Sequence, residues 1–200
     1  MKQRQYNLDK TAYDLEKENK RFIWKFFTYL YFLLFSLRNF KEIYIMCGII
    51  GFTGNLQAPG ILVDGLQQLE YRGYDSAGIA VLNNNKCEVT KCKGRVNALE
   101  EKVKSITGSV GIGHTRWATH GKVSDSNSHP HKYGKVTLVH NGIIENYADL
   151  RKFLTDNGYH FVSQTDTEVV PNLIDYYFTS DKSQNTIEKF LRAVKNAVSD

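Results

Sequence analysis

MCGIIGF, residues 46–52, is the stretch of sequence that most constrains the fold. A cysteine followed by a short apolar run predicts a buried strand over residues 47–52. Met46, directly before this strand, is one of only two methionines in the chain, the other being Met1. We therefore expect the functional domain to occupy residues 47–200 and residues 1–45 to be an N-terminal extension outside it.

The rest of the chain alternates short apolar runs with amphipathic stretches. Apolar residues recur on one helical face over residues 59–69, which predicts a helix there. Apolar runs between Asn-, Gly- and Ser-rich turns predict strands over residues 77–82, 87–92, 109–115 and 135–140. Further helices are expected over residues 96–106, 145–156, 167–178 and 185–198. Runs of paired strands and paired helices favour an α+β fold with antiparallel sheets over a doubly wound parallel one.

The N-terminal extension differs in composition from the domain. It holds twelve of the twenty-five aromatic residues, and Phe22–Leu37 is apolar almost throughout, interrupted mainly by Lys25. A membrane-spanning helix needs about 20 apolar residues, so this run is too short. A signal peptide would need small residues before the cleavage site, where Tyr44 and Met46 stand. The remaining interpretation is upstream translated sequence, or an extension that the domain does not require.

Charge and cysteine content exclude two classes of function. Residues 47–200 carry seventeen Lys/Arg and sixteen Asp/Glu, so the domain has no excess of cations to neutralise phosphates. We therefore expect no nucleic-acid binding. Three cysteines without an Asn-x-Ser/Thr acceptor give no sign of a disulfide framework or of secretion. A reducing, cytoplasmic compartment is the expectation.

Two short glycine motifs resemble phosphate-binding loops, but each lacks a residue that such a loop requires. Gly111-Ile-Gly113 opens like a dinucleotide loop, but Arg116 stands where the third glycine belongs. Gly121-Lys122 is followed by Val123, so the hydroxyl that a P-loop offers to magnesium is missing. We expect no nucleotide cofactor.

Metal binding is the next alternative. The candidate ligands are Cys87, Cys92, His120, His129 and His131. The two cysteines are five residues apart in a predicted strand, so they point to opposite faces and cannot share a metal. The polar segment 124–131, which contains His129-Pro-His131, is expected to be a turn-rich loop and the most mobile part of the domain. We expect neither a metal nor another cofactor.

Five longer motifs identify a family. In chain order they are MCGIIG (46–51), LEYRGYDSAGIAV (69–81), HTRWATHG (114–121), HNGIIENY (140–147) and SQTDTEV (163–169). They resemble the glutaminase domain of the glutamine–fructose-6-phosphate aminotransferases, which are class II glutamine amidotransferases. Sister families that act on phosphoribosyl pyrophosphate, aspartate or oxoglutarate resemble only the short cores of these motifs. The resemblance implies a four-layer αββα sandwich of the N-terminal nucleophile hydrolase type.

Cys47 has the chemistry of a nucleophile only under one condition. A thiol needs a base, and the α-amine of the same residue can serve when that residue is the first of the chain. Cys47 can become the first residue if translation starts at Met46, because the cell can remove an initiator methionine that precedes a small side chain. Standing alone, CGIIG would more often contain an ordinary buried strand cysteine.

The resemblance also implies the groups that bind glutamine and its oxyanion. The side-chain amide of Asn141 and the backbone N–H of Gly142 would form the oxyanion hole. Arg116 would bind the substrate α-carboxylate, and Asp166 would bind the α-ammonium. Taken alone, Asn-Gly is a common hairpin turn and either charge could lie on the surface.

Further residues of these motifs have less specific roles. Trp117, Thr119 and His120 resemble a lid that closes over bound glutamine. Arg72 and Gly73 resemble residues beside the nucleophile, although either could simply hold a turn. We interpret Tyr71, Tyr74 and Asp75 as structural.

The expected reaction is hydrolysis of L-glutamine to glutamate and ammonia. In the full enzymes of this family an isomerase domain, absent from this sequence, binds fructose 6-phosphate and makes glucosamine 6-phosphate, and these enzymes can form homo-oligomers. The alternative is a catalytically silent, membrane-attached module, in which residues 1–45 persist and Cys47 never gains a free amine.

Overall fold

The computed structural model describes residues 47–72, 74–117 and 121–200. The predictions for residues 1–46, Gly73, Thr119 and His120 lie outside the described residues, as does the side chain of Arg72. Within these three ranges, no helix is both long enough and apolar enough to cross a bilayer.

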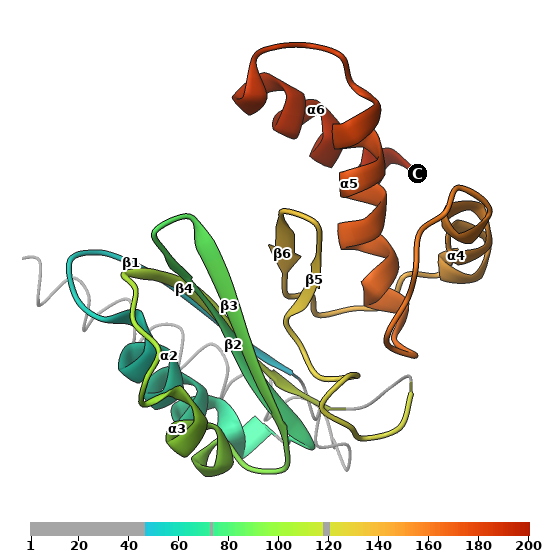
Figure 1. Cartoon of the computed structure of the whole chain (residues 1–200). Helices are drawn as coiled ribbons and strands as arrows, with labels where there is room; N and C mark the ends of the chain where they lie inside the picture. Colours follow the sequence, from blue (N-terminus) through green and yellow to red (C-terminus); the bar gives the residue numbers. More distant parts are fainter. Residues whose placement is uncertain (1–46, 73, 118–120) are drawn as a thin grey trace, which may run out of the picture. The chain divides into compact units, whose positions relative to one another are not determined.

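A four-stranded antiparallel sheet forms the first half of the described chain (Figure 1). Its strands are β1 (Gly48–Thr53), β2 (Ser76–Asn83), β3 (Lys86–Lys93) and β4 (Val110–Arg116), in the order β1-β4-β2-β3. Asn84 and Asn85 join β2 to β3 with positive φ angles of 47° and 64°, as a two-residue hairpin requires. All four strands are confirmed to within one residue at each end. The structure is thus a mixed α+β fold with an antiparallel sheet.

The first strand is less buried than its composition predicts. β1 lies at the edge of the sheet, and the side chain of Ile49 is 45% exposed. The alternate residues Ile50 and Phe52 pack against the core. From Ile49 onward β1 therefore buries one face only, and the expectation of a buried strand was wrong for its other face.

Two helices cover one face of this sheet (Figure 1). They are α2 (Ala58–Leu69), as predicted, and α3 (Asn97–Val103), which is shorter than the expected range 96–106. Leu62 and Leu66 of α2 pack with Ile79 and Val81 of β2 and with Leu99 of α3, all of them fully buried. This core holds β1 against the rest of the sheet and so fixes the position of Cys47, which directly precedes β1.

The second half of the chain packs helices beside a short hairpin. Its strands are β5 (His131–Tyr133) and β6 (Val136–Leu138), and its helices are α4 (Tyr147–Asp156), α5 (Val169–Ser180) and α6 (Thr186–Ser199). α5 lies against both strands and against α6 (Figure 1). The three helices are confirmed, although a separate 3-10 turn, Asp166–Glu168, precedes α5. Of the strand expected over residues 135–140, only Val136–Leu138 forms a strand, and β5 was not predicted.

The segment 124–131 is exposed only at Asp125 and Ser126, and its second half is buried. Asn127, Ser128, His129 and His131 are all nearly inaccessible. The polar groups are satisfied locally, since the Ser128 hydroxyl donates to the Ser124 carbonyl at 2.8 Å. The His129 carbonyl sits over the sheet so closely that a Cβ on Gly78 would lie 2.2 Å from it. Burial and hydrogen bonding argue against the expected mobility.

Candidate active site

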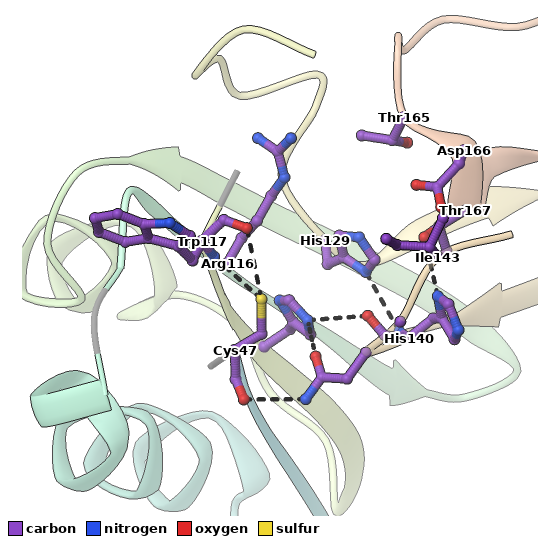
Figure 2. Close-up of a pocket in the computed structure, with 12 residues that line it drawn as sticks. Cys47, Arg116, Trp117, His129, His140, Ile143, Thr165, Asp166 and Thr167 are labelled. Atoms are coloured by element: carbon purple, nitrogen blue, oxygen red, sulfur yellow. Dashed lines mark hydrogen bonds between the residues drawn. The ribbon is translucent and has the colours of Figure 1, made fainter. Parts of the chain in front are cut away.

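One pocket gathers residues from distant parts of the sequence (Figure 2). Its volume is about 270 Å³, close to the lower end of the range for small-molecule sites. It is lined by Cys47, His114, Arg116, Trp117, His129, His140, Asn141, Gly142, Ile143, Thr165, Asp166 and Thr167. Six of these were predicted as site residues: Cys47, Arg116, Trp117, Asn141, Gly142 and Asp166. The others were not, although His114, His140, Thr165 and Thr167 belong to the same motifs.

Cys47 lies directly before β1, and the sheet holds it in place. The next residue, Gly48, donates its backbone N–H to Thr115 Oγ1 on β4 at 3.0 Å. The Cys47 Sγ accepts the backbone N–H of Trp117 at 3.1 Å (Figure 2). That donor can stabilise negative charge on the sulfur.

Asn141 and Gly142 lie in the loop between β6 and α4, so they do not form the turn of a β-hairpin. The Asn141 Nδ2 donates to the carbonyl oxygen of Cys47 at 3.0 Å. Gly142 has a φ of 148°, and a Cβ there would lie 2.9 Å from His140 Nε2. This position therefore requires glycine. The loop places an amide donor beside the cysteine.

Arg116 is buried, with 4% of its surface exposed, so it is not a surface charge. Its Nη1 lies 3.7 Å from Asp75 Oδ1, and the Asp75 backbone N–H donates to the Arg116 carbonyl at 2.7 Å. A buried cation needs such a partner. Asp75, which we interpreted as structural, thus holds the guanidinium that lines the pocket.

Asp166 supplies a negative charge to the same pocket. It is 4% exposed and lies in the 3-10 turn that leads into α5. Its Oδ2 accepts the backbone N–H of Ile144 at 2.8 Å, which fixes the carboxylate. The pocket therefore presents one buried cation and one buried anion, the pair that an α-amino acid requires.

Three histidines form a buried group beside the pocket, and two of them, His114 and His129, line it. The rings of His114 and His129 stack with centroids 4.2 Å apart, and the ring of His131 meets His129 edge-on at 4.6 Å. Burial lowers the pKa of His114 to about 4 and that of His131 to about 3. Burial also lowers the pKa of His129, with the nearby His114 as a second cause. All three rings are neutral at neutral pH.

Acidification from pH 7.5 to 5.5 should destabilise the fold. Below pH 6.5 the unfolded chain binds protons at these histidines, whereas the folded state, with its lowered pKa values, does not. The free energy of unfolding therefore falls as pH falls through this window. Each histidine contributes about 1.4 kcal/mol at one unit below its ordinary pKa, or about 4 kcal/mol for three. Urea unfolding at the two pH values measures the loss.

His131→Gln provides the control for this experiment. His131 Nε2 lies 2.9 Å from Thr165 Oγ1, and glutamine offers a polar group there that does not titrate. The pH-dependent loss should shrink by about a third, whatever the variant does to stability at pH 7.5. A loss equal to that of the wild type would mean that other groups cause it.

Comparison with known proteins agrees with this geometry. Residues 98–184 match the profile of the glutamine amidotransferase domain. The chain is 56% identical over 158 residues to the glutamine–fructose-6-phosphate aminotransferase [isomerizing] of Clostridium tetani. That match covers 77% of this chain and 25% of the relative. It is 58% identical over 140 residues to the enzyme of the same name from Caldanaerobacter subterraneus. That match covers 68% of this chain and 23% of the relative.

The fold has a match among solved structures as well. The glutamine phosphoribosylpyrophosphate amidotransferase of B. subtilis superposes with a TM-score of 0.61 at 27% identity, over 76% of this chain and 32% of that one. The chain therefore belongs to the class II glutamine amidotransferases. Within that class, its amidotransferase domain is of the glutamine–fructose-6-phosphate aminotransferase type. The chain spans about a quarter of the length of the curated relatives it matches.

Proposed function

We propose that this domain hydrolyses the side-chain amide of L-glutamine, with Cys47 as the nucleophile. The observation that carries the proposal is the convergence of three groups on one pocket. The Cys47 sulfur, the Asn141 amide and the opposite charges of Arg116 and Asp166 all line it. The three cysteines are free thiols, which supports a reducing, cytoplasmic setting.

The reaction begins when the α-amine of Cys47, as the first residue, takes the thiol proton. The Cys47 Sγ then bonds to the side-chain carbonyl carbon of glutamine, and the carbonyl oxygen becomes an oxyanion. Asn141 and the Gly142 N–H donate to that oxygen. The C–N bond breaks, ammonia leaves with the proton from the α-amine, and a thioester remains. Water then attacks the thioester, which releases glutamate and restores the thiol.

Substrate binding follows from the charges of the pocket. Arg116, held by Asp75, forms hydrogen bonds to the α-carboxylate, and the Asp166 Oδ1 accepts from the α-ammonium. Trp117 is 41% exposed at the rim and would close over bound glutamine together with Thr119 and His120. Arg72 and Gly73 would support the nucleophile.

The proposal extends to the fold and to the longer relatives. α2 and α3 on the four-stranded sheet would form two layers of an αββα sandwich, and the β5–β6 hairpin with α5 would belong to the other two. The domain would span residues 47–200, with residues 1–45 outside it. In a longer protein of this type, the ammonia would reach an isomerase domain that converts fructose 6-phosphate to glucosamine 6-phosphate, in a homo-oligomer.

The test is product formation by protein whose first residue is verified as Cys47. L-Glutamine should yield glutamate and ammonia in equal amounts. L-Asparagine, whose amide lies one methylene closer to the charged groups, should yield far less. A Cys47-initiated protein that is folded and releases neither product from glutamine would refute the proposal.

Asn141→Ala should lower kcat about 100- to 1,000-fold, because one preorganised oxyanion donor is lost. Glutamine binding, measured by calorimetry, should change much less, because the amide acts mainly in the transition state. The matched control is Asn146→Ala, an asparagine in the same loop whose amide donates to the Asp200 carbonyl. Comparable losses of turnover and of binding in Asn141→Ala would indicate a folding defect instead.

A further inference from the structure

His114 makes a contact that the proposed mechanism does not use. It lies on β4, two residues before Arg116, and is 1% exposed. Its Nε2 lies 2.8 Å from Asn141 Oδ1 and 3.2 Å from the His140 carbonyl oxygen. Both neighbours are oxygen acceptors, so Nε2 must carry the hydrogen. His114 Nδ1 has no hydrogen-bond partner among the described residues, which suits a bare lone pair.

This tautomer determines which way the Asn141 amide faces. With Oδ1 accepting from His114, the NH₂ group faces Cys47 and donates to its carbonyl oxygen at 3.0 Å. The flipped amide would set its NH₂ against the His114 N–H and its oxygen against the Cys47 carbonyl. Moving the ring hydrogen to Nδ1 would relieve the first clash, but it would set the bare Nε2 against the His140 carbonyl. Only one arrangement satisfies all four groups.

The His114 ring is itself held in place by a second histidine, His129. His129 stacks on it with an angle of 17° between the ring planes. His129 Nδ1 accepts the His140 backbone N–H at 3.4 Å, and its carbonyl rests against Gly78. Because burial lowers the pKa of His114 to about 4, the ring stays neutral throughout the physiological range. Protonation therefore does not disturb the contact to Asn141 in this range.

We propose that His114 is a positioning residue for the oxyanion hole: its Nε2–H holds Asn141 Oδ1, so that the amide N–H groups face the reacting carbonyl. This inference rests on the proposed role of Asn141. An asparagine carries two N–H donors, and one of them is occupied by the Cys47 carbonyl. The second can reach the oxyanion only if the amide cannot rotate. Preorganisation of this kind is what makes such donors effective.

Two substitutions separate positioning from packing. His114→Phe keeps an aromatic ring against His129 but removes the donor, and should lower kcat about 10- to 100-fold with KM little changed. His114→Gln loses the ring but places an amide N–H near the position of Nε2, and should stay within about threefold of the wild type. If His114 only fills space, the order reverses, with His114→Phe active and His114→Gln impaired. That reversal would overturn the proposal.

A double-mutant comparison tests whether His114 acts through Asn141. In an Asn141→Ala background the donor no longer has its target, so adding His114→Phe should lower kcat by less than about twofold further. If His114→Phe costs as much in that background as in the wild type, the effect does not pass through Asn141 and the proposal fails.

NMR on the 200-residue chain, kept in solution by a mild detergent, tests the contact without any measurement of activity. Long-range ¹H–¹⁵N correlations of the His114 ring should show hydrogen on Nε2 and none on Nδ1. The opposite tautomer would overturn the proposal. If the Cys47-initiated wild type releases no glutamate, the proposed function fails by itself, and the tautomer still decides whether His114 orients Asn141.

Discussion

Replacing Cys47 with alanine should abolish the release of glutamate and ammonia from glutamine while the domain stays folded. The attacking sulfur is lost, and no neighbouring group can form the thioester in its place. The structural cost is small, because the half-buried thiol gives up only its hydrogen bonds with the Trp117 backbone, from the N–H at 3.1 Å and to the carbonyl at 3.7 Å. Product assays measure the activity, and thermal unfolding followed by circular dichroism reports the fold.

Cys87→Ala is the matched control for this experiment. Cys87 lies on β3, far along the sequence from the pocket residues, and its thiol contacts Thr137 Oγ1 at 3.4 Å. Its removal should leave turnover unchanged, which separates loss of the nucleophile from loss of any thiol. Glutaminase activity of Cys47→Ala equal to that of the wild type would eliminate Cys47 as the nucleophile.

Much of the fold can be predicted because local patterns and tertiary packing agree. The two strands β2 and β3 could be predicted because the turn residues Asn84 and Asn85 separate two short runs of strand-forming residues. The apolar face of residues 59–69 likewise matches the helix α2 that buries Leu62 and Leu66. In both cases the local sequence pattern predicts the same structure that tertiary packing stabilises.

The misses occur where burial depends on distant contacts. β5 is only three residues long and its strand pairing depends on the turn at Gly134, so no periodicity can show it. His129-Pro-His131 has the composition of a surface turn. It is nevertheless buried, with the His129 carbonyl against Gly78 of β2. Neither feature has a hydrophobic periodicity of its own that would predict it.

In the site, too, the residues could be predicted from their motifs, whereas the contacts between them could not. Cys47, Arg116, Asn141 and Asp166 were singled out because their motifs resemble a family, and the pocket brings them together. The contacts that hold them were not foreseen. Asp75 is 41 residues from Arg116, and His114 is 27 residues from Asn141. Single sequences carry the identity of reactive groups more readily than the pairings that orient them.

Protein made from Met1 and left uncut should be inactive, whereas protein made from Met46 should be active after its methionine is removed. In the longer form the nitrogen of Cys47 is an amide and cannot take a proton from the thiol. Removal of Met46 converts that amide to an amine. The difference in glutamate formation should be close to all or none.

The comparison requires a verified N-terminus and soluble protein on both sides. Intact-mass measurement shows whether each preparation starts at Met1, Met46 or Cys47. The apolar run 22–37 is expected to draw the longer protein into aggregates, so both forms are assayed in the same mild detergent. A third sample, the Met1 form cut before Cys47 by a protease at an inserted site, should regain activity. That recovery would show that the extension blocks the amine and does not damage the fold.

The geometry around the sulfur explains why so much depends on this amine. The hydrogen bonds described for Cys47 Sγ join it to the backbone N–H and carbonyl of Trp117, and neither is a base at neutral pH. His114 also lines the pocket, but its Nε2 already carries a hydrogen that faces two oxygens. If the uncut Met1 form turned over glutamine as fast as the Cys47 form, a different group would have to deprotonate the thiol. The N-terminal nucleophile mechanism would then be wrong for this protein.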